Sequence, residues 1–189
     1  MAACRRIGAP AQFTTDPAVV RAASALILPG VGAFANGIAS LRRHRLEQPI
    51  RDVAAAGIPI LGICLGMQLL AEISEEFGEH EGLGLISGRV VRLQPSHPGE
   101  RVPNVGWFDV STAKNSRLFA GIEDGSAFYF VHSYYVRCAN LIDSAGSIAF
   151  GSGAVTVAVE RGNIFGVQFH PEKSQDLGLQ LLDNFARIL

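Results

Sequence analysis

The sequence predicts an α/β fold, a three-layer domain with a doubly wound, mostly parallel sheet and an antiparallel extension in its second half. Three observations predict it. In the first half, short apolar runs alternate with helix-forming segments, which is typical of βαβ units. After about Gly84 the pattern changes to short strands separated by turns. The chain of 189 residues, 48% of them hydrophobic, is long enough to bury one core, so residues 1–189 are expected to form a single domain.

The first half is expected to contain two strands, each followed by helix. The elements are a strand over Ser24–Leu28, a helix over 38–56 broken near Pro49, a strand over Ile58–Ile63 and a helix from Leu65 to about Phe77. The apolar run 53–71 has the length of a membrane span, but Pro59, its glycines and Gln68 favour a strand that leads into a helix.

The second half is expected to consist of short strands and a final helix. The expected strands are Leu85–Leu93, Val102–Val110, Ala127–Val136, Ser147–Phe150, Val155–Glu160 and Ile164–Phe169. The closing segment Leu177–Leu189 repeats apolar residues at helical spacing, which predicts an amphipathic helix.

The composition excludes several classes of protein. Sixteen basic and seventeen acidic residues give a net charge of −1, so there is no basic surface for nucleic acid or for a membrane. The high apolar and low charged content excludes a disordered chain. Three cysteines favour a reducing compartment, and residues 1–20 lack the apolar region of a signal peptide, so we expect a cytoplasmic protein.

Cys64 is the candidate nucleophile. It lies in Gly62-Ile63-Cys64-Leu65-Gly66, between an apolar strand and a helix, which is the pattern of a nucleophile elbow with cysteine in place of serine. The flanking glycines fit a sharp turn, and the N-terminus of the helix would favour the thiolate. The alternative is a buried structural cysteine. Cys4 and Cys138 lack this context and are interpreted as small core or surface residues.

His170 is the candidate base, and Glu172 is the group that would orient it. His170 closes the apolar strand 164–169, and Pro171 biases it toward extended backbone, in which residues two apart share a face. The carboxylate could therefore fix the tautomer of the imidazole. The alternative is a strand-end histidine beside a solvated acid.

The other histidines do not indicate a metal site. His44, His80 and His97 lie in polar stretches and are interpreted as surface residues, whereas His132 lies in an apolar strand. Metal sites need ligands clustered at suitable spacing, and neither these histidines nor a pairing of Cys64 with His132 supplies it. We expect neither a metal nor a cofactor.

Five motifs occur in this order along the chain: Pro29-Gly30-Val31-Gly32, Gly62-Ile63-Cys64-Leu65-Gly66-Met67-Gln68, Val102-Pro103-Asn104-Val105-Gly106-Trp107, Phe130-Val131-His132-Ser133-Tyr134 and Gly166-Val167-Gln168-Phe169-His170-Pro171-Glu172-Lys173-Ser174. Taken together, they resemble the class I, triad-type glutamine amidotransferases, and within that class the glutaminase subunits of imidazole glycerol phosphate synthase. The resemblance covers about residues 10–189 and implies a flavodoxin-like α/β fold.

The resemblance implies a glutaminase that hydrolyses L-glutamine to glutamate and ammonia. Cys64 would form a γ-glutamyl thioester, His170 would carry the proton, and Glu172 would orient His170. The oxyanion hole would lie at Gly32 and Leu65. The groups that would hold the amino and carboxylate groups of glutamine are Gln68, Glu76, His132, Ser133 and Tyr134.

The resemblance also implies a partner. A (βα)8-barrel cyclase, bound as a heterodimer, would use the ammonia to make imidazole glycerol phosphate and AICAR in histidine biosynthesis. Trp107 and Lys173 would face the cyclase at the ammonia gate; from the residues alone, Trp107 fits a core aromatic equally well, and Lys173 fits a solvated charge. Asn104 stands where the family usually has His, and Phe108 where it has Asn, so the identity of the synthase stays open.

The first residues depart from the family as well. Its members begin with an apolar strand and an Asp-Tyr-Gly-x-Gly-Asn turn, whereas this chain is expected to start inside the first helix, at about Ala2–Gly8. Either the start of the sequence is misassigned or truncated, or the protein is a real variant that lacks this strand. Because a sheet without it would expose backbone and apolar surface, we expect a tendency to associate.

Three other functions compete with this interpretation. A paralogue could feed ammonia to another synthase, for example in surface-sugar amidation. The chain could also be a non-catalytic subunit that binds a partner, although the set of Cys64, His170 and Glu172 argues against that. The third alternative is a cysteine hydrolase of the α/β-hydrolase type. In such enzymes the acid precedes the histidine by many residues, whereas Glu172 follows His170 by two, so the spacing disfavours this alternative.

Overall fold

The computed structural model describes residues 2–113 and 115–188, which form two sheets and the helices around them. The larger sheet has the strand order β1-β2-β11-β10-β9-β6-β7, and the smaller has the order β4-β3-β5-β8. The strands are β1 (Leu26–Gly30), β2 (Ile60–Cys64), β3 (Ala71–Ser74), β4 (His80–Glu81), β5 (Ile86–Arg92), β6 (Asn104–Thr112), β7 (Ser126–His132), β8 (Tyr134–Cys138), β9 (Ser144–Phe150), β10 (Gly153–Arg161) and β11 (Ile164–Val167).

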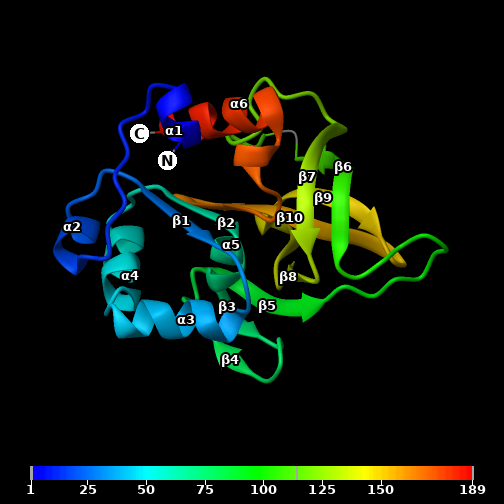
Figure 1. Ribbon diagram of the computed structural model, residues 1–189, viewed down its shortest axis with the longest axis horizontal. Helices are drawn as coiled ribbons and strands as arrows, with labels where there is room; N and C mark the ends of the chain where they lie inside the picture. Colours follow the sequence, from blue (N-terminus) through cyan, green and yellow to red (C-terminus); the bar gives the residue numbers. More distant parts are fainter. Residues whose placement is uncertain (1, 114, 189) are drawn as a thin grey trace.

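Helices cover both faces of the larger sheet. Figure 1 shows α1 and α6 on one side of β1, β2 and β10, and α3, α4 and α5 on the other, so the three predicted layers are present. The helices are α1 (Ala2–Arg6), α2 (Pro17–Arg21), α3 (Phe34–Arg43), α4 (Glu47–Ala55), α5 (Leu65–Leu69) and α6 (Gln175–Ala186), with short 3-10 turns η1 (Leu141–Asp143) and η2 (Pro171–Lys173).

The parallel part of the larger sheet is centred on β2. β1 and β11 flank it, both parallel to it, and the register sets Gly30 opposite Cys64. The strands beyond β11 pair antiparallel to their neighbours, which confirms the predicted α/β class with an antiparallel extension. All five residues of β2 are buried, as expected of a strand covered by helices on both faces.

Alternate residues of the central strands supply two apolar cores, one on each face of the sheet. Ile60 and Ile164 pack with Phe34 and the other apolar residues of α3, α4 and α5. Their neighbours Leu61 and Phe165 point the other way and pack with the apolar face of α6. The carboxyl end of β2 is therefore held from both sides.

The prediction of a long helix over Leu65–Phe77 was wrong. The helix α5 ends at Leu69, and the next residues form β3, which pairs in parallel with β5. The sequence of β3 favours a helix no less than a strand, so tertiary pairing decides its conformation.

Two other boundaries also differ from the prediction. The helical break lies at residues 44–46, where Arg45 has a φ of 55°, and Pro49 lies in the first turn of α4, where a proline removes no hydrogen bond. The predicted strand Ala127–Val136 is two strands in different sheets, β7 and β8, which meet at Ser133. The other strands shift by a few residues, and Leu189, the predicted end of the last helix, lies outside the described residues.

In the part of the chain that the structure describes, no helix is long and apolar enough to cross a membrane. The apolar run 53–71 instead comprises the end of α4, the strand β2 and the helix α5.

The edge strand β1 generates a prediction about association. Ile27 on this strand is 37% exposed, and one side of the strand has no neighbour among the described strands. We expect the chain to associate as its concentration rises, and Ile27→Lys to reduce this, because a charge on an edge strand opposes pairing with another chain. Light scattering over a concentration series measures it. Ile142→Lys, at an exposed residue outside the sheets, is the matched control. A wild-type chain that stays monomeric throughout would contradict the prediction.

Candidate active site

The backbone at Cys64 turns sharply from β2 into α5. Cys64 has φ 55° and ψ −113°, a conformation that residues with a side chain rarely adopt. Such backbone strain persists where the surroundings enforce it and is common at active sites. The turn places the Cys64 side chain at the carboxyl end of a parallel strand, where ligands bind in open α/β sheets.

Two glycines make this turn possible. A Cβ on Gly66 would lie 1.7 Å from the carbonyl oxygen of Leu28, and a Cβ on Gly62 would lie 2.6 Å from the backbone nitrogen of Met67. Backbone atoms therefore exclude any side chain at either position, which confirms the crowding expected from the Gly-x-Cys-x-Gly pattern. The helix α5 that follows this turn has five residues, Leu65–Leu69.

His170 and Glu172 lie beside Cys64 as a hydrogen-bonded pair. The Nδ1 atom of His170 is 2.8 Å from Oε1 of Glu172, and its extended backbone precedes Pro171, as predicted. Since Nδ1 is bound to Glu172, Nε2 is the ring nitrogen left for the hydrogen-bonding interaction of His170 with the Cys64 side chain. The His170 imidazole is buried, whereas the Glu172 side chain is 45% exposed, so the acid lies at the solvent side.

Charge and burial oppose each other at this pair. The hydrogen-bonding interaction with Cys64, followed by that with Glu172, raises the pKa of His170 to about 9 despite its burial. Burial raises the pKa of Glu172, but the hydrogen bond from His170 and the charges of His170 and Lys173 outweigh it, so this pKa lies below its ordinary value. The pair is therefore an imidazolium and a carboxylate at neutral pH.

A chain of buried amides lies on another side of Cys64. Nε2 of Gln168 donates to Sγ of Cys64 at 3.7 Å, and Oε1 of Gln168 accepts from Nε2 of Gln68 at 3.0 Å. Gln68 also donates to the carbonyl oxygen of Tyr134 at 3.1 Å. Both N–H groups of the Gln68 carboxamide thus have protein partners, which leaves Oε1 as the polar atom that a ligand can use.

His132 lies behind this chain. Its Nδ1 donates to the carbonyl oxygen of Tyr134 at 2.9 Å, and its Nε2 accepts from the amide of Asn104 at 3.2 Å. Burial, opposed by the hydrogen bond to Tyr134 and assisted by the charge of His170, lowers the pKa of His132 to about 4. The ring is therefore neutral at physiological pH, and both of its nitrogens are bound within the protein.

Of the remaining residues expected at the site, Gly32, Leu65 and Glu76 lie in or beside the loop between β1 and α3. Gly32 in this loop is exposed, with a φ of 95°, and Leu65 is the first residue of α5. Oε2 of Glu76 accepts a hydrogen bond from the backbone nitrogen of Phe34 at 2.6 Å, so Glu76 holds the end of the loop where α3 begins. Ser133 is half-buried, and its carbonyl oxygen accepts from Leu93.

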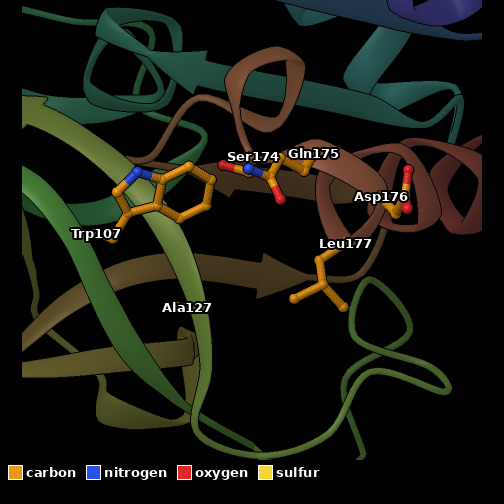
Figure 2. A pocket seen from close by; sticks show the side chains of 6 residues that line it. All are labelled: Trp107, Ala127, Ser174, Gln175, Asp176 and Leu177. Carbon is orange, nitrogen blue, oxygen red and sulfur yellow. The ribbon is translucent and has the colours of Figure 1, made fainter.

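Trp107 and Lys173 lie at the surface beside the segment that carries His170 and Glu172. Trp107 is 47% exposed, which excludes a core position, and its ring meets Tyr129 edge-on with centroids 5.9 Å apart. Nζ of Lys173 lies 5.8 Å from the centre of the same tyrosine ring. Trp107 and Leu177 are among the residues that line a hollow of about 320 Å³. Figure 2 shows the Trp107 indole on one side and Leu177, in the first turn of α6, on the other.

Within residues 2–113 and 115–188, no group of three or more His, Cys, Asp or Glu side chains is arranged to hold a metal ion. Cys4 and Cys138 are buried. Burial raises the pKa of Cys138 to about 11, which keeps that thiol protonated.

The sequence comparisons agree with this geometry. Residues 5–189 match the family model described as "Glutamine amidotransferase class-I". The chain belongs to the class-I glutamine amidotransferases. It is 47% identical over 184 residues to a protein of Moorella thermoacetica named "Imidazole glycerol phosphate synthase subunit HisH", covering 97% of this chain and 86% of that protein. A protein of the same name from Rhodopirellula baltica is 48% identical over 185 residues, covering 97% and 88%.

Solved structures support the fold. The amidotransferase superimposes with a TM-score of 0.61 on a glutamine amidotransferase of Thermotoga maritima, at 17% identity and covering 96% of this chain and 68% of that one. The glutaminase domain of Trypanosoma brucei CTPS, solved with bound acivicin, gives a TM-score of 0.63 at 20% identity, covering 90% and 74%. At these identities the likeness establishes the α/β fold of the family.

Two buried residues at the site were not singled out from the sequence. Gln168 is fully buried against Cys64, and Ser174 is 1% exposed. Oγ of Ser174 donates to the carbonyl oxygen of His170 at 2.7 Å and accepts from the backbone nitrogen of Tyr129, which fixes the backbone of His170. Both belong to the Gly166–Ser174 motif. For Gln168 the available signal was a polar residue within an apolar run, two residues before His170.

The raised pKa of His170 generates a prediction about stability. A folded pKa of about 9 against an ordinary 6.5 means that this group contributes stability that is complete below about pH 6.5 and is lost as the pH rises through 9. We expect Glu172→Gln to lower the pKa of His170 and to reduce stability at pH 6 by about 1 kcal/mol or less, because solvent screens the half-exposed carboxylate. Urea unfolding and NMR titration of the imidazole measure this, with Glu123→Gln as the control. A wild-type His170 that titrates near 6.5 would contradict it.

Proposed function

We propose that this chain is the glutaminase subunit of an imidazole glycerol phosphate synthase, hydrolysing L-glutamine and passing the ammonia to a cyclase subunit in histidine biosynthesis. The observation that carries the proposal is the strained turn that holds Cys64 against the His170–Glu172 pair. It is supported by relatives near 47% identity that carry the name of this subunit.

In the first half of the reaction, Cys64 acts as the nucleophile. Its thiolate sulfur attacks the carboxamide carbon of glutamine and forms a C–S bond, and the carbonyl electrons move onto oxygen. When the tetrahedral intermediate collapses, the C–N bond breaks, and His170 gives its proton to the leaving nitrogen. Ammonia leaves, and a γ-glutamyl thioester remains on Cys64.

In the second half, the now neutral His170 takes a proton from water. The hydroxyl oxygen attacks the thioester carbon, the C–S bond breaks, and glutamate and the Cys64 thiolate are released. Glu172 holds Nδ1 and keeps Nε2 directed at the reacting atoms in both halves. The backbone N–H groups at Gly32 and Leu65 would stabilise the negative oxygen.

The two ends of the amino acid require opposite charges. Glu76, half-buried beside the loop, would take the α-ammonium group, and Oε1 of Gln68 would accept a hydrogen bond from the substrate. The α-carboxylate would bind at the backbone of Ser133 and Tyr134. Since both ring nitrogens of His132 are bound within the protein, His132 would support this segment from behind.

The partner would dock on the outer face of the β6–β7 hairpin. Val105 pairs with Val131 and Trp107 pairs with Tyr129 on these strands, and Val105, Trp107 and Val131 are exposed. This apolar patch adjoins Lys173, and Tyr129, which pairs with Trp107, accepts a hydrogen bond from the backbone nitrogen of the buried His170 at its carbonyl oxygen. A cyclase bound here would cover the exit that ammonia takes from Cys64.

A glutaminase assay with three mixtures tests the proposal. They are the chain alone, the chain with a histidine-pathway cyclase, and that pair with the cyclase's ribonucleotide substrate. We expect glutamate release to rise on the order of 100-fold in the third mixture, because a bound substrate shifts the coupled site toward its active form. A folded chain that stays silent in all three mixtures would refute the assignment to this synthase.

Matched variants locate the activity and the interface. Cys64→Ala should abolish glutamate release, whereas Cys138→Ala, at a buried cysteine outside the site, should keep it. Trp107→Ala should raise the concentration of cyclase needed for stimulation about 30-fold, as expected for a central interface tryptophan. Ile27→Ala, on β1 at the opposite end of the sheet, should leave that concentration unchanged.

A further inference from the structure

Gln168 is a fully buried polar side chain for which the reaction described above has no role. It follows β11 and precedes His170 by two residues. Its backbone N–H donates to the carbonyl oxygen of Val157 at 2.8 Å, so the main chain is tied to β10 and needs nothing from the side chain. A buried carboxamide is costly unless its polar atoms are paired, so its partners indicate its role.

The partners of the Gln168 side chain are Cys64 and Gln68. The N–H group at Nε2 reaches Sγ of Cys64 at 3.7 Å, and Oε1 accepts from Nε2 of Gln68 at 3.0 Å. A rotated carboxamide would turn its oxygen toward the sulfur and set its NH2 group against that of Gln68. The pairing with Gln68 thus determines which atom faces Cys64.

The orientation of Gln68 is determined in turn by the backbone. Its Nε2 also donates to the carbonyl oxygen of Tyr134, a group that can only accept. The same oxygen accepts from Nδ1 of His132, whose other nitrogen accepts from Asn104. Every donor in this series of hydrogen bonds therefore has a set direction. The series ends at the Nε2 N–H group of Gln168, which points at the Cys64 sulfur.

A fixed N–H donor acts differently on the two forms of a thiol. Neutral sulfur is a weak acceptor, whereas a thiolate is charged and gains more from a hydrogen bond, above all in a buried site. The donor also restrains the sulfur from a second direction, while His170 approaches as the proton carrier. Cys64 would thereby keep one position when it is deprotonated.

We propose that Gln168 is a positioning residue for Cys64, whose amide N–H stabilises and aims the thiolate. This proposal rests on the proposed glutaminase function, because the Cys64 sulfur that Gln168 positions is the nucleophile of that reaction. Its primary test uses neither glutamine nor a partner, so it can succeed or fail independently of that function.

The test follows alkylation of Cys64 by iodoacetamide as a function of pH in the folded chain. Mass spectrometry of the Cys64 peptide separates it from Cys4 and Cys138. For Gln168→Met, which keeps the length of the side chain and removes the donor, we expect the half-maximal pH to rise by about one unit, the shift expected for one lost charge-assisted hydrogen bond. Gln168→Glu, which places a carboxylate beside the sulfur, should raise it further. Gln94→Met, at an exposed glutamine, is the control.

Turnover gives a second readout. In Gln168→Met we expect kcat for glutamine to fall about tenfold with little change in KM, because the residue contacts the nucleophile and not the substrate. If the thermal midpoint falls while the alkylation profile and kcat stay at wild-type values, Gln168 has a structural role alone and the proposal is wrong. If Gln168→Met does not fold, Gln168→Leu, which is neutral and also lacks the N–H donor, decides by the same profile.

Discussion

The backbone at Cys64 is the constraint on which the site depends. A residue with a side chain at φ 55° and ψ −113° carries strain on the order of 1–3 kcal/mol, and the packing around it must offset that strain. Gly62 and Gly66 allow the chain to pass within van der Waals contact of itself, and the two cores hold β2 from both faces. Since β1 and β11 pair with β2 in register, the loop after Gly30 and the segment that ends in His170 reach the sulfur from opposite sides.

Hydrogen bonds fix the orientation of the polar side chains around this turn. His170 is held by Glu172 at Nδ1 and by Ser174 through its backbone, and Gln168 is held by Gln68. In an interior with little water such bonds are stronger than at the surface, and a group left unpaired would be costly. The site is therefore largely organised before substrate arrives, and the exposed Glu172 is where solvent reaches it.

The sequence predicted the parts of the site that have a local pattern and missed those that depend on tertiary contacts. Glycine spacing around Cys64 and the Pro after His170 determine backbone conformation locally, so the elbow and the orientation of Glu172 followed from them. The end of α5 at Leu69 did not, because pairing with β5 turns a helix-forming stretch into β3. Gln168 was missed because the contact of its carboxamide with Cys64 joins residues 104 positions apart. The contact between Asn104 and His132 was not predicted either, because the two residues lie on neighbouring strands.

Labelling with an electrophilic analogue of L-glutamine tests most directly whether this turn presents Cys64 as a nucleophile in a glutamine-shaped site. The chain is incubated with the L- or D-enantiomer of the analogue, with and without excess L-glutamine, and the modified peptide is identified by mass spectrometry. We predict one adduct, on Cys64, formed by the L-enantiomer and prevented by glutamine. Equal labelling by both enantiomers, or labelling of Cys4 or Cys138 in place of Cys64, would contradict this prediction.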